Sequence, residues 1–280
     1  MRVDAHQHFW QLSRGEYPWL SKDFSAIYRD FSAEQLQPLL VANQIDKSIL
    51  VQAAATLAES QYLLDIAKAH DFVAGVVGWV DFEAADVASQ IELLYQHGHS
   101  NEQSLLKGLR PMVQDIADPN WLLKPQLQAG ITSMCERQLS FDALVLAHQL
   151  PVLAKFIEKY PDLPVVIDHA AKPSINSGEF KAWARDIALI AKNGKTFCKL
   201  SGLLTEAGDN FSVASLQPYV DHLLYCFGDE RLVWGSDWPV LNLAADYHRW
   251  CEMTEQLLQG LTKAQRANIY GLNAIRFYRL

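Results

Sequence analysis

Two histidines stand one residue apart near the start of the chain, His6 and His8 in the segment MRVDAHQHFW. On a β-strand the side chains of residues i and i+2 point the same way, so both imidazoles can reach one point. Neutral imidazoles bind borderline divalent ions such as Zn²⁺, and they also transfer protons. The pair therefore indicates a metal site or an acid–base site, provided that further polar groups meet it.

Later in the chain, a third histidine and an aspartate each follow a short apolar run. His169 comes directly after VVID, and Asp237 comes directly after LVWGS. Three imidazoles and one carboxylate suit a single Zn²⁺, which polarises a carbonyl and lowers the pKa of bound water toward ~7. Asp237 would then act as the general base. The segment Gly235-Ser236-Asp237 lacks the G-x-S-x-G pattern of a nucleophilic serine, which disfavours a serine hydrolase.

Eight short apolar segments could position these residues. They lack a clean polar alternation, as buried parallel strands do. We expect strands at Val3–His8, Ser48–Ala53, Val73–Val80, Leu105–Val113, Phe141–Ala147, Val165–His169, Thr196–Gly202 and Leu232–Ser236. Amphipathic segments between them predict helices at Ala33–Ala42, Glu59–His70, Pro151–Tyr160, Phe180–Ala191, Val213–Phe227 and Tyr247–Leu258.

This alternation predicts an α/β fold, a (β/α)8 TIM barrel that forms a single domain over residues 1–280. An open doubly wound sheet is the alternative, but it requires a glycine-rich phosphate turn after an early strand. Phe9-Trp10-Gln11-Leu12 follows the first strand instead. We expect the segment Asn268–Leu280 to form a last helix that packs on the outside of the barrel.

In such a barrel the chemistry lies at the carboxyl ends of the strands. Arg110 ends the fourth expected strand and could offer its planar guanidinium to a carbonyl, so it joins Asp237 and His169 as a catalytic candidate. Lys172 follows the sixth strand and could contact substrate. Lys199 lies within the seventh strand, where a structural ion pair is an equal alternative to a role in the site.

Further residues near these strand ends could contact a substrate. Trp10 and Trp238 are expected as pocket walls, because aromatic faces stack on the apolar surface of sugars, and Trp19 is left open. Gln52 and His148 are candidates for contacts with hydroxyl groups. Asp4 shares the strand face of His6 but lies deeper, so we expect it to fix an imidazole from behind.

Together these motifs resemble the sugar-lactonase branch of the amidohydrolase superfamily. The segments concerned are His6-Gln7-His8-Phe9-Trp10, Gly108-Leu109-Arg110, Asp168-His169 with Lys172-Pro173, Lys199-Leu200-Ser201-Gly202 and Trp234-Gly235-Ser236-Asp237-Trp238-Pro239. That branch includes L-fuconolactonase, L-rhamnonolactonase and the pyrone-dicarboxylate lactonases. The resemblance implies a (β/α)8 fold and hydrolysis of the lactone ring of a sugar acid. It also implies that Asp237 activates water and later protonates the leaving alkoxide.

The resemblance leaves the cofactor open between one divalent ion, with Zn²⁺ as the first choice, and none, since some members of the branch work without a metal. The ligands would be His6, His8, His169 and Asp237. A two-metal site is disfavoured, because Arg110 stands where the superfamily places a lysine or carboxylate. Two other functions stay open: a metal-dependent decarboxylase of the same superfamily, and a non-catalytic barrel that binds a sugar or a metal.

Composition restricts the partners. The formal net charge of −8 disfavours nucleic acid, which requires a basic surface. We expect no membrane insertion, because no apolar run approaches the ~20 residues that span a bilayer. The four cysteines form no CxxC pair, which favours a reducing compartment and hence the cytoplasm. The expected partner is a small sugar lactone, and assembly into a homo-oligomer stays open.

Overall fold

The computed structural model describes residues 1–100 and 103–280, and its centre is an eight-stranded parallel sheet. The strands follow one another in chain order: β1 (Val3–Gln7), β2 (Lys47–Val51), β3 (Val73–Gly78), β6 (Leu106–Leu109), β7 (Ser140–Ala143), β8 (Val165–Ile167), β9 (Phe197–Leu200) and β10 (Leu232–Trp234). Each overlaps one expected strand, so the predicted barrel is confirmed. A short hairpin of β4 (His99–Ser100) and β5 (Gln103–Ser104) precedes β6.

The last strand returns to the first, just beyond their carboxyl ends. Gln7 and Trp238 form a parallel bridge. The His8 N–H donates to the Trp238 carbonyl at 2.7 Å, and the Asp237 N–H donates to the His6 carbonyl at 2.8 Å. These bonds place the backbone that carries both early histidines directly beside the backbone that carries Asp237.

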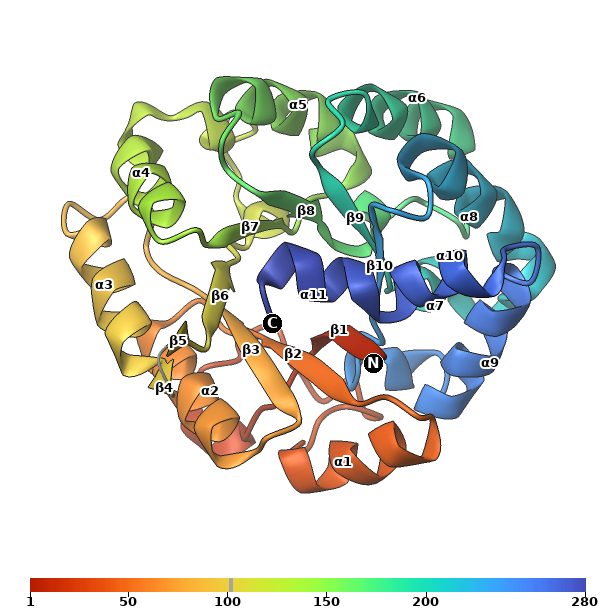
Figure 1. The fold of residues 1–280 in the computed structure, drawn as a ribbon, viewed down its shortest axis with the longest axis horizontal. Coiled ribbons are helices and arrows are strands. Elements are labelled where there is room, and N and C mark those ends of the chain that lie inside the picture. The colour runs from red at the N-terminus through yellow and green to blue at the C-terminus, as the bar shows by residue number, and fades with distance from the viewer. Residues whose placement is uncertain (101–102) are drawn as a thin grey trace.

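Helices surround the strands as an outer ring (Figure 1). The described residues form the helices α1 (Ala33–Ala42), α2 (Leu57–Ala69), α3 (Val87–His97), α4 (Gln128–Glu136), α5 (Leu150–Lys159), α6 (Phe180–Ala191), α7 (Leu203–Ala207), α8 (Val213–Phe227), α9 (Tyr247–Leu257), α10 (Lys263–Ala267) and α11 (Asn273–Tyr278). Helix α2 begins two residues before the expected start, because the Thr56 hydroxyl caps it by accepting from the Glu59 N–H at 3.0 Å. Helices α3, α4, α7 and α10 were not among the expected elements.

The expectation that the carboxyl-terminal segment packs on the outside is wrong. Helix α11 lies across the middle of the ring of strands (Figure 1). Ala274, Phe277 and Tyr278 pack against a cluster of small apolar side chains from the strands, which includes Val3 and Ala5. Burial of this face closes the barrel at the end opposite the catalytic candidates. In the described part of the chain, every helix is too short or too polar to cross a membrane.

Candidate active site

A pocket of about 330 Å³ opens at the carboxyl ends of the strands. Five of the candidate residues line it, namely His8, Arg110, His169, Lys172 and Asp237. The other lining residues are Trp19, Phe24, Ala53, Met112, Gln114, Asp115, Leu144, Thr205, Glu206, Val240 and Leu243. The pocket therefore joins polar groups from several strands with apolar walls from the loops.

Three imidazoles converge on one oxygen atom at the floor of this pocket. Asp237 Oδ1 lies 3.3 Å from His8 Nε2 and 3.7 Å from His6 Nε2. The same oxygen lies 3.8 Å from His169 Nε2. The two early histidines also meet each other, with 3.2 Å between their Nε2 atoms. The structure thus brings together the four residues that the sequence selected as ligands.

An unusual backbone turn aims His169 into the group. His169, Ala170, Ala171 and Lys172 have φ angles between 49° and 59°, the left-handed region that non-glycine residues rarely occupy. Each such residue costs of the order of 1 kcal/mol or more, so the surrounding packing must hold the turn in place. All but Lys172 are buried. Strain of this kind is typical of functional sites.

Hydrogen bonds and burial set the charges of the group. His8 Nδ1 lies 2.8 Å from the Val51 carbonyl, so it carries the proton and Nε2 offers its lone pair to the pocket. Burial lowers the pKa of both His6 and His8, and it lowers the pKa of His169 to about 4. Burial alone would raise the pKa of Asp237, but His169, His8 and His6 together hold it below its ordinary value. A carboxylate among neutral imidazoles results.

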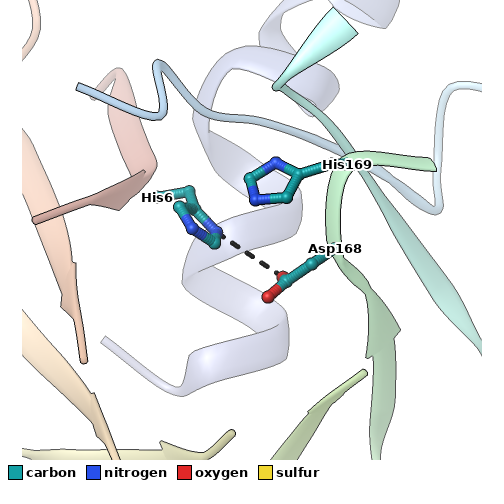
Figure 2. A group of neighbouring side chains, drawn as sticks. All are labelled: His6, Asp168 and His169. Atoms are coloured by element: carbon teal, nitrogen blue, oxygen red, sulfur yellow. Dashed lines mark ion pairs between the residues drawn. The ribbon is translucent and has the colours of Figure 1, made fainter. Parts of the chain in front are cut away.

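A buried ion pair lies directly beneath His6. Lys199 Nζ lies 2.6 Å from Asp142 Oδ2, 2.9 Å from Asp168 Oδ1 and 3.0 Å from His6 Nδ1. Figure 2 shows Asp168 beside His6, with 3.5 Å between Oδ1 and Nδ1, and His169 above both. Burial would raise the pKa of Asp168, but the Lys199 ammonium and neighbouring groups hold it well below its ordinary value. Lys199 thus takes part in an ion pair that touches the active site.

Known proteins resemble the chain over its whole length. The amidohydrolase family model matches residues 3–280. The chain belongs to the amidohydrolase family. It is 42% identical over 283 residues to an L-fucono-1,5-lactonase of Burkholderia ambifaria, covering 100% of this chain and 96% of that protein. A second L-fucono-1,5-lactonase, from Burkholderia multivorans, is 31% identical over 292 residues, with the same coverage.

A solved structure extends the comparison to three dimensions. An amidohydrolase crystal structure from Burkholderia multivorans with bound zinc superposes with a TM-score of 0.93. It is 31% identical in sequence and covers 100% of this chain and 99% of its own. The fold of the chain is therefore closely similar to that of a solved amidohydrolase over its whole length.

The convergent atoms of this amidohydrolase fit a single metal ion. Two overlapping groups place their potential ligand atoms within 4.8 Å of one another: His6, His8 and Asp237, and His6, Asp168 and His169. Ligands at about 2.0–2.1 Å from a tetrahedral zinc ion are themselves roughly 3.3 Å apart. The Nε2 and Oδ1 separations of 3.2 to 3.8 Å approach that value. The donor set of nitrogen and one carboxylate oxygen is that of catalytic zinc.

Arg110 adds a fixed cation at the edge of the same group. Its Nη1 lies 3.4 Å from Asp168 Oδ2 and 3.4 Å from His6 Nε2. Its Nη2 donates to the Gln52 carbonyl, and the Gln52 amide donates to the Arg110 carbonyl at 2.8 Å. Gln52 is fully buried and therefore positions Arg110, which corrects its expected contact with a substrate hydroxyl.

Three further expectations are corrected by burial or distance. Of the described residues that line the pocket, Trp19 is the sole tryptophan, while Trp10 and Trp238 are buried behind it. Trp10 is held there because its indole N–H donates to the Arg29 carbonyl at 2.8 Å. His148 is exposed on the short turn Ala147–Gln149 and lies outside the described pocket lining.

Asp4 does not fix an imidazole. Its carboxylate accepts the backbone N–H of Ser236 at 2.8 Å and of His6 at 3.2 Å, together with the Tyr247 hydroxyl at 2.9 Å. Asp4 therefore joins the backbones of the first and last strands beneath the site. The backbone of His6 is positioned by this carboxylate, and its ring is positioned by Lys199.

Sequence reasoning missed several pocket residues. Gln114 and Asp115 follow β6, and Thr205 and Glu206 lie on α7, in segments that no strand-end rule selects. The one available signal was position: these segments follow the fourth and seventh strands, and loops after strands build the mouth of a (β/α)8 barrel.

Proposed function

We propose that this amidohydrolase, as one domain over residues 1–280, hydrolyses the lactone ring of a sugar acid such as L-fuconolactone. The observation that carries the proposal is the convergence of three imidazole Nε2 atoms on Asp237 Oδ1 within 3.3 to 3.8 Å at the pocket floor. The full-length similarity to two L-fucono-1,5-lactonases supports this choice of substrate class.

The pocket suits a small polar ring. A volume of about 330 Å³ lies at the lower end of the range for small-molecule sites. Trp19, Met112 and Leu144 offer apolar surface to the carbon–hydrogen face of a sugar ring. Lys172 and Glu206 offer a donor and an acceptor to its hydroxyl groups. This mixture favours a neutral polyhydroxylated lactone.

In the proposed reaction Asp237 accepts a proton from water, and the water oxygen attacks the lactone carbonyl carbon. The carbonyl oxygen becomes an oxyanion, which the Arg110 guanidinium stabilises. The tetrahedral species collapses as the bond between the carbonyl carbon and the ring oxygen breaks. Asp237 returns its proton to that oxygen, and the open hydroxy acid leaves. No covalent bond to the protein forms.

His6, His8, His169 and Asp237 would hold a single divalent ion, with zinc as the first choice. When bound, this ion would polarise the carbonyl and acidify the attacking water. The protein's own contribution is to keep the imidazoles neutral and Asp237 ionised, as their lowered pKa values indicate. Arg110 lies close enough to share the electrophilic role, with Nη1 3.4 Å from His6 Nε2.

Acid release from a panel of neutral sugar lactones, recorded by pH-stat, tests the proposal. We expect turnover by the parent chain. In Asp237→Asn the turnover rate should fall by about 10² to 10⁴-fold, the factor that a general base usually contributes. Asp162→Asn is the matched control, because Asp162 is exposed at the other end of the barrel, just before β8. An Asp237→Asn protein that opens lactones at the parent rate would refute the assignment. Loss of absorbance from aromatic acids, without lactone turnover, would favour the decarboxylase.

A further inference from the structure

Lys199 contacts the second group of potential metal ligands. His6, Asp168 and His169 form this group (Figure 2). The Lys199 ammonium is within 3.0 Å of two members of that group, His6 Nδ1 and Asp168 Oδ1. These two atoms are 3.5 Å apart, a separation that two ligands of one ion could have. The side chain thus brings a positive charge to the position where a second ion would bind.

The surroundings of this ammonium are those of a cation site. Lys199, Asp142 and Asp168 are all fully buried. Within residues 1–100 and 103–280, Asp168 Oδ1 makes no hydrogen bond of acceptable geometry, although the Lys199 ammonium is 2.9 Å away. A buried carboxylate oxygen in that state is stabilised mainly by a neighbouring charge.

Lys199 is also anchored from below, on the side away from the pocket. Asp142 Oδ2 accepts from Lys199 at 2.6 Å and from the Tyr278 hydroxyl at 2.6 Å. Asp142 Oδ1 accepts from the Ser140 hydroxyl at 2.9 Å. Since Tyr278 belongs to α11, which closes the barrel, the lysine cannot turn outward to solvent without breaking this packing.

Repulsion by the Lys199 ammonium disfavours a second metal ion at this position. The ammonium lies 2.6 Å from Asp142 Oδ2 and 2.9 Å from Asp168 Oδ1, and Arg110 Nη1 lies 3.4 Å from Asp168 Oδ2, so both carboxylates already face permanent cations. A divalent ion bound to His6 Nδ1 and Asp168 Oδ1 would lie within a few ångströms of this ammonium, and like charges at such a distance in a buried site repel each other strongly.

We propose that the Lys199 ammonium is a built-in cation that occupies the second ligand group and thereby limits the active site to one metal ion. The inference rests on the proposed active site, but its test counts bound ions and requires no turnover. Replacing Lys199 by a neutral side chain, with one carboxylate neutralised at the same time, should free His6 Nδ1 and Asp168 Oδ1, the two ligand atoms that the ammonium contacts, for a further ion.

The test compares zinc content per chain after saturation and removal of loosely bound metal, measured by mass spectrometry of the element. The test variant is Lys199→Met with Asp142→Asn, which removes one charge of each sign and keeps a hydrogen-bonding partner for Tyr278. The matched control is Lys107→Met, since Lys107 is a buried lysine of β6 whose Nζ contacts the Arg279 carbonyl at 3.2 Å, on the closed side of the barrel. We expect the double variant to bind one zinc ion per chain more than both the parent and the control.

Adding His8→Asn to the parent and to the double variant locates the extra ion. His8 belongs only to the first ligand group, which is formed by His6, His8 and Asp237. The difference of one ion should persist. Equal zinc content in parent and double variant would overturn the proposal, and so would a difference that disappears with His8→Asn. If the double variant is unfolded without metal, zinc should restore its circular dichroism, and continued unfolding with zinc would also overturn it. A parent that binds no zinc would count against the metal in the proposed function and leave the expected difference unchanged.

Discussion

A methyl group placed at Gly202 should damage the active site through His169. Gly202 precedes α7 with φ +67°, and a Cβ added there would lie 2.7 Å from both Cγ and Nδ1 of His169. Ordinary carbon contacts begin at about 3.5 Å, so the ring would have to retreat by roughly 0.5–1 Å. Two features oppose this movement of the His169 ring. The left-handed turn holds its backbone, and a hydrogen bond of 2.9 Å to the Ser201 hydroxyl holds its Nδ1.

The size of the effect follows from this displacement. Misplacing a reacting group by about 1 Å can cost ~10²-fold in rate, so we expect Gly202→Ala to lower kcat of lactone hydrolysis by about 10 to 100-fold. The left-handed backbone separately costs an alanine about 1–2 kcal/mol of stability. Activity and stability should therefore change for two different reasons, which a suitable control can separate.

Gly194→Ala provides that control. Gly194 has φ +74° in the turn between α6 and β9, and among the described residues no heavy atom lies within 4 Å of a Cβ built there. Both variants should lose similar stability in urea unfolding, but only Gly202→Ala should lose turnover in the pH-stat assay. Equal activity of the two variants would show that the position of His169 does not matter to the reaction as proposed.

Two further predictions concern pH and metal. Burial raises the pKa of Glu59 to about 8 from 4.5, against the opposing N–H groups of Ala54 and Ala53. The folded state therefore keeps a proton that the unfolded state releases, and the free energy of unfolding should fall as pH rises from 4.5 to about 8. The upper bound of this fall is about 4–5 kcal/mol. Glu59→Gln should flatten the dependence in urea unfolding at each pH, and parallel curves would contradict the shift. Chelation should slow lactone turnover without abolishing it, because Arg110 remains as an electrophile; complete loss that zinc restores would assign the whole role to the ion.

The sequence could predict which histidines and which aspartate converge, because strand periodicity and the order of the strands are enough to bring them together. Strand periodicity puts His6 and His8 on one face, and the order of a (β/α)8 barrel puts the last strand beside the first. His169 and Asp237 follow their strands by two and three residues, at the same rim. These inferences need only the order of the strands and the alternation of side chains, and for that reason they survive small errors in the expected strand boundaries.

The pocket walls could not be predicted, because loops place them. Trp10 and Trp238 are close in sequence to the candidate ligands His8 and Asp237, yet their rings pack inward, edge-on against Phe31 at 5.4 and 5.2 Å between centroids. Trp19 reaches the pocket from the loop after β1, where its indole N–H donates to the Ala53 carbonyl at 2.7 Å. Closeness in sequence to a catalytic residue therefore indicates burial near the site as readily as contact with substrate.

The role of the carboxyl terminus shows a second limit of the sequence. The sequence places Lys199 within a strand but does not give its depth, which depends on how the strands pair: Asp142 is level with Val166, and Ile167 with Cys198. At that depth Tyr278 closes the barrel and holds Asp142, Asp142 holds Lys199, and Lys199 contacts the ring of His6. One buried chain of hydrogen bonds and ion pairs therefore joins the closing helix to the candidate active site. Because the loss of one contact leaves a buried charged neighbour without its partner, a substitution at Tyr278 should both lower the free energy of unfolding and disturb the group around His6.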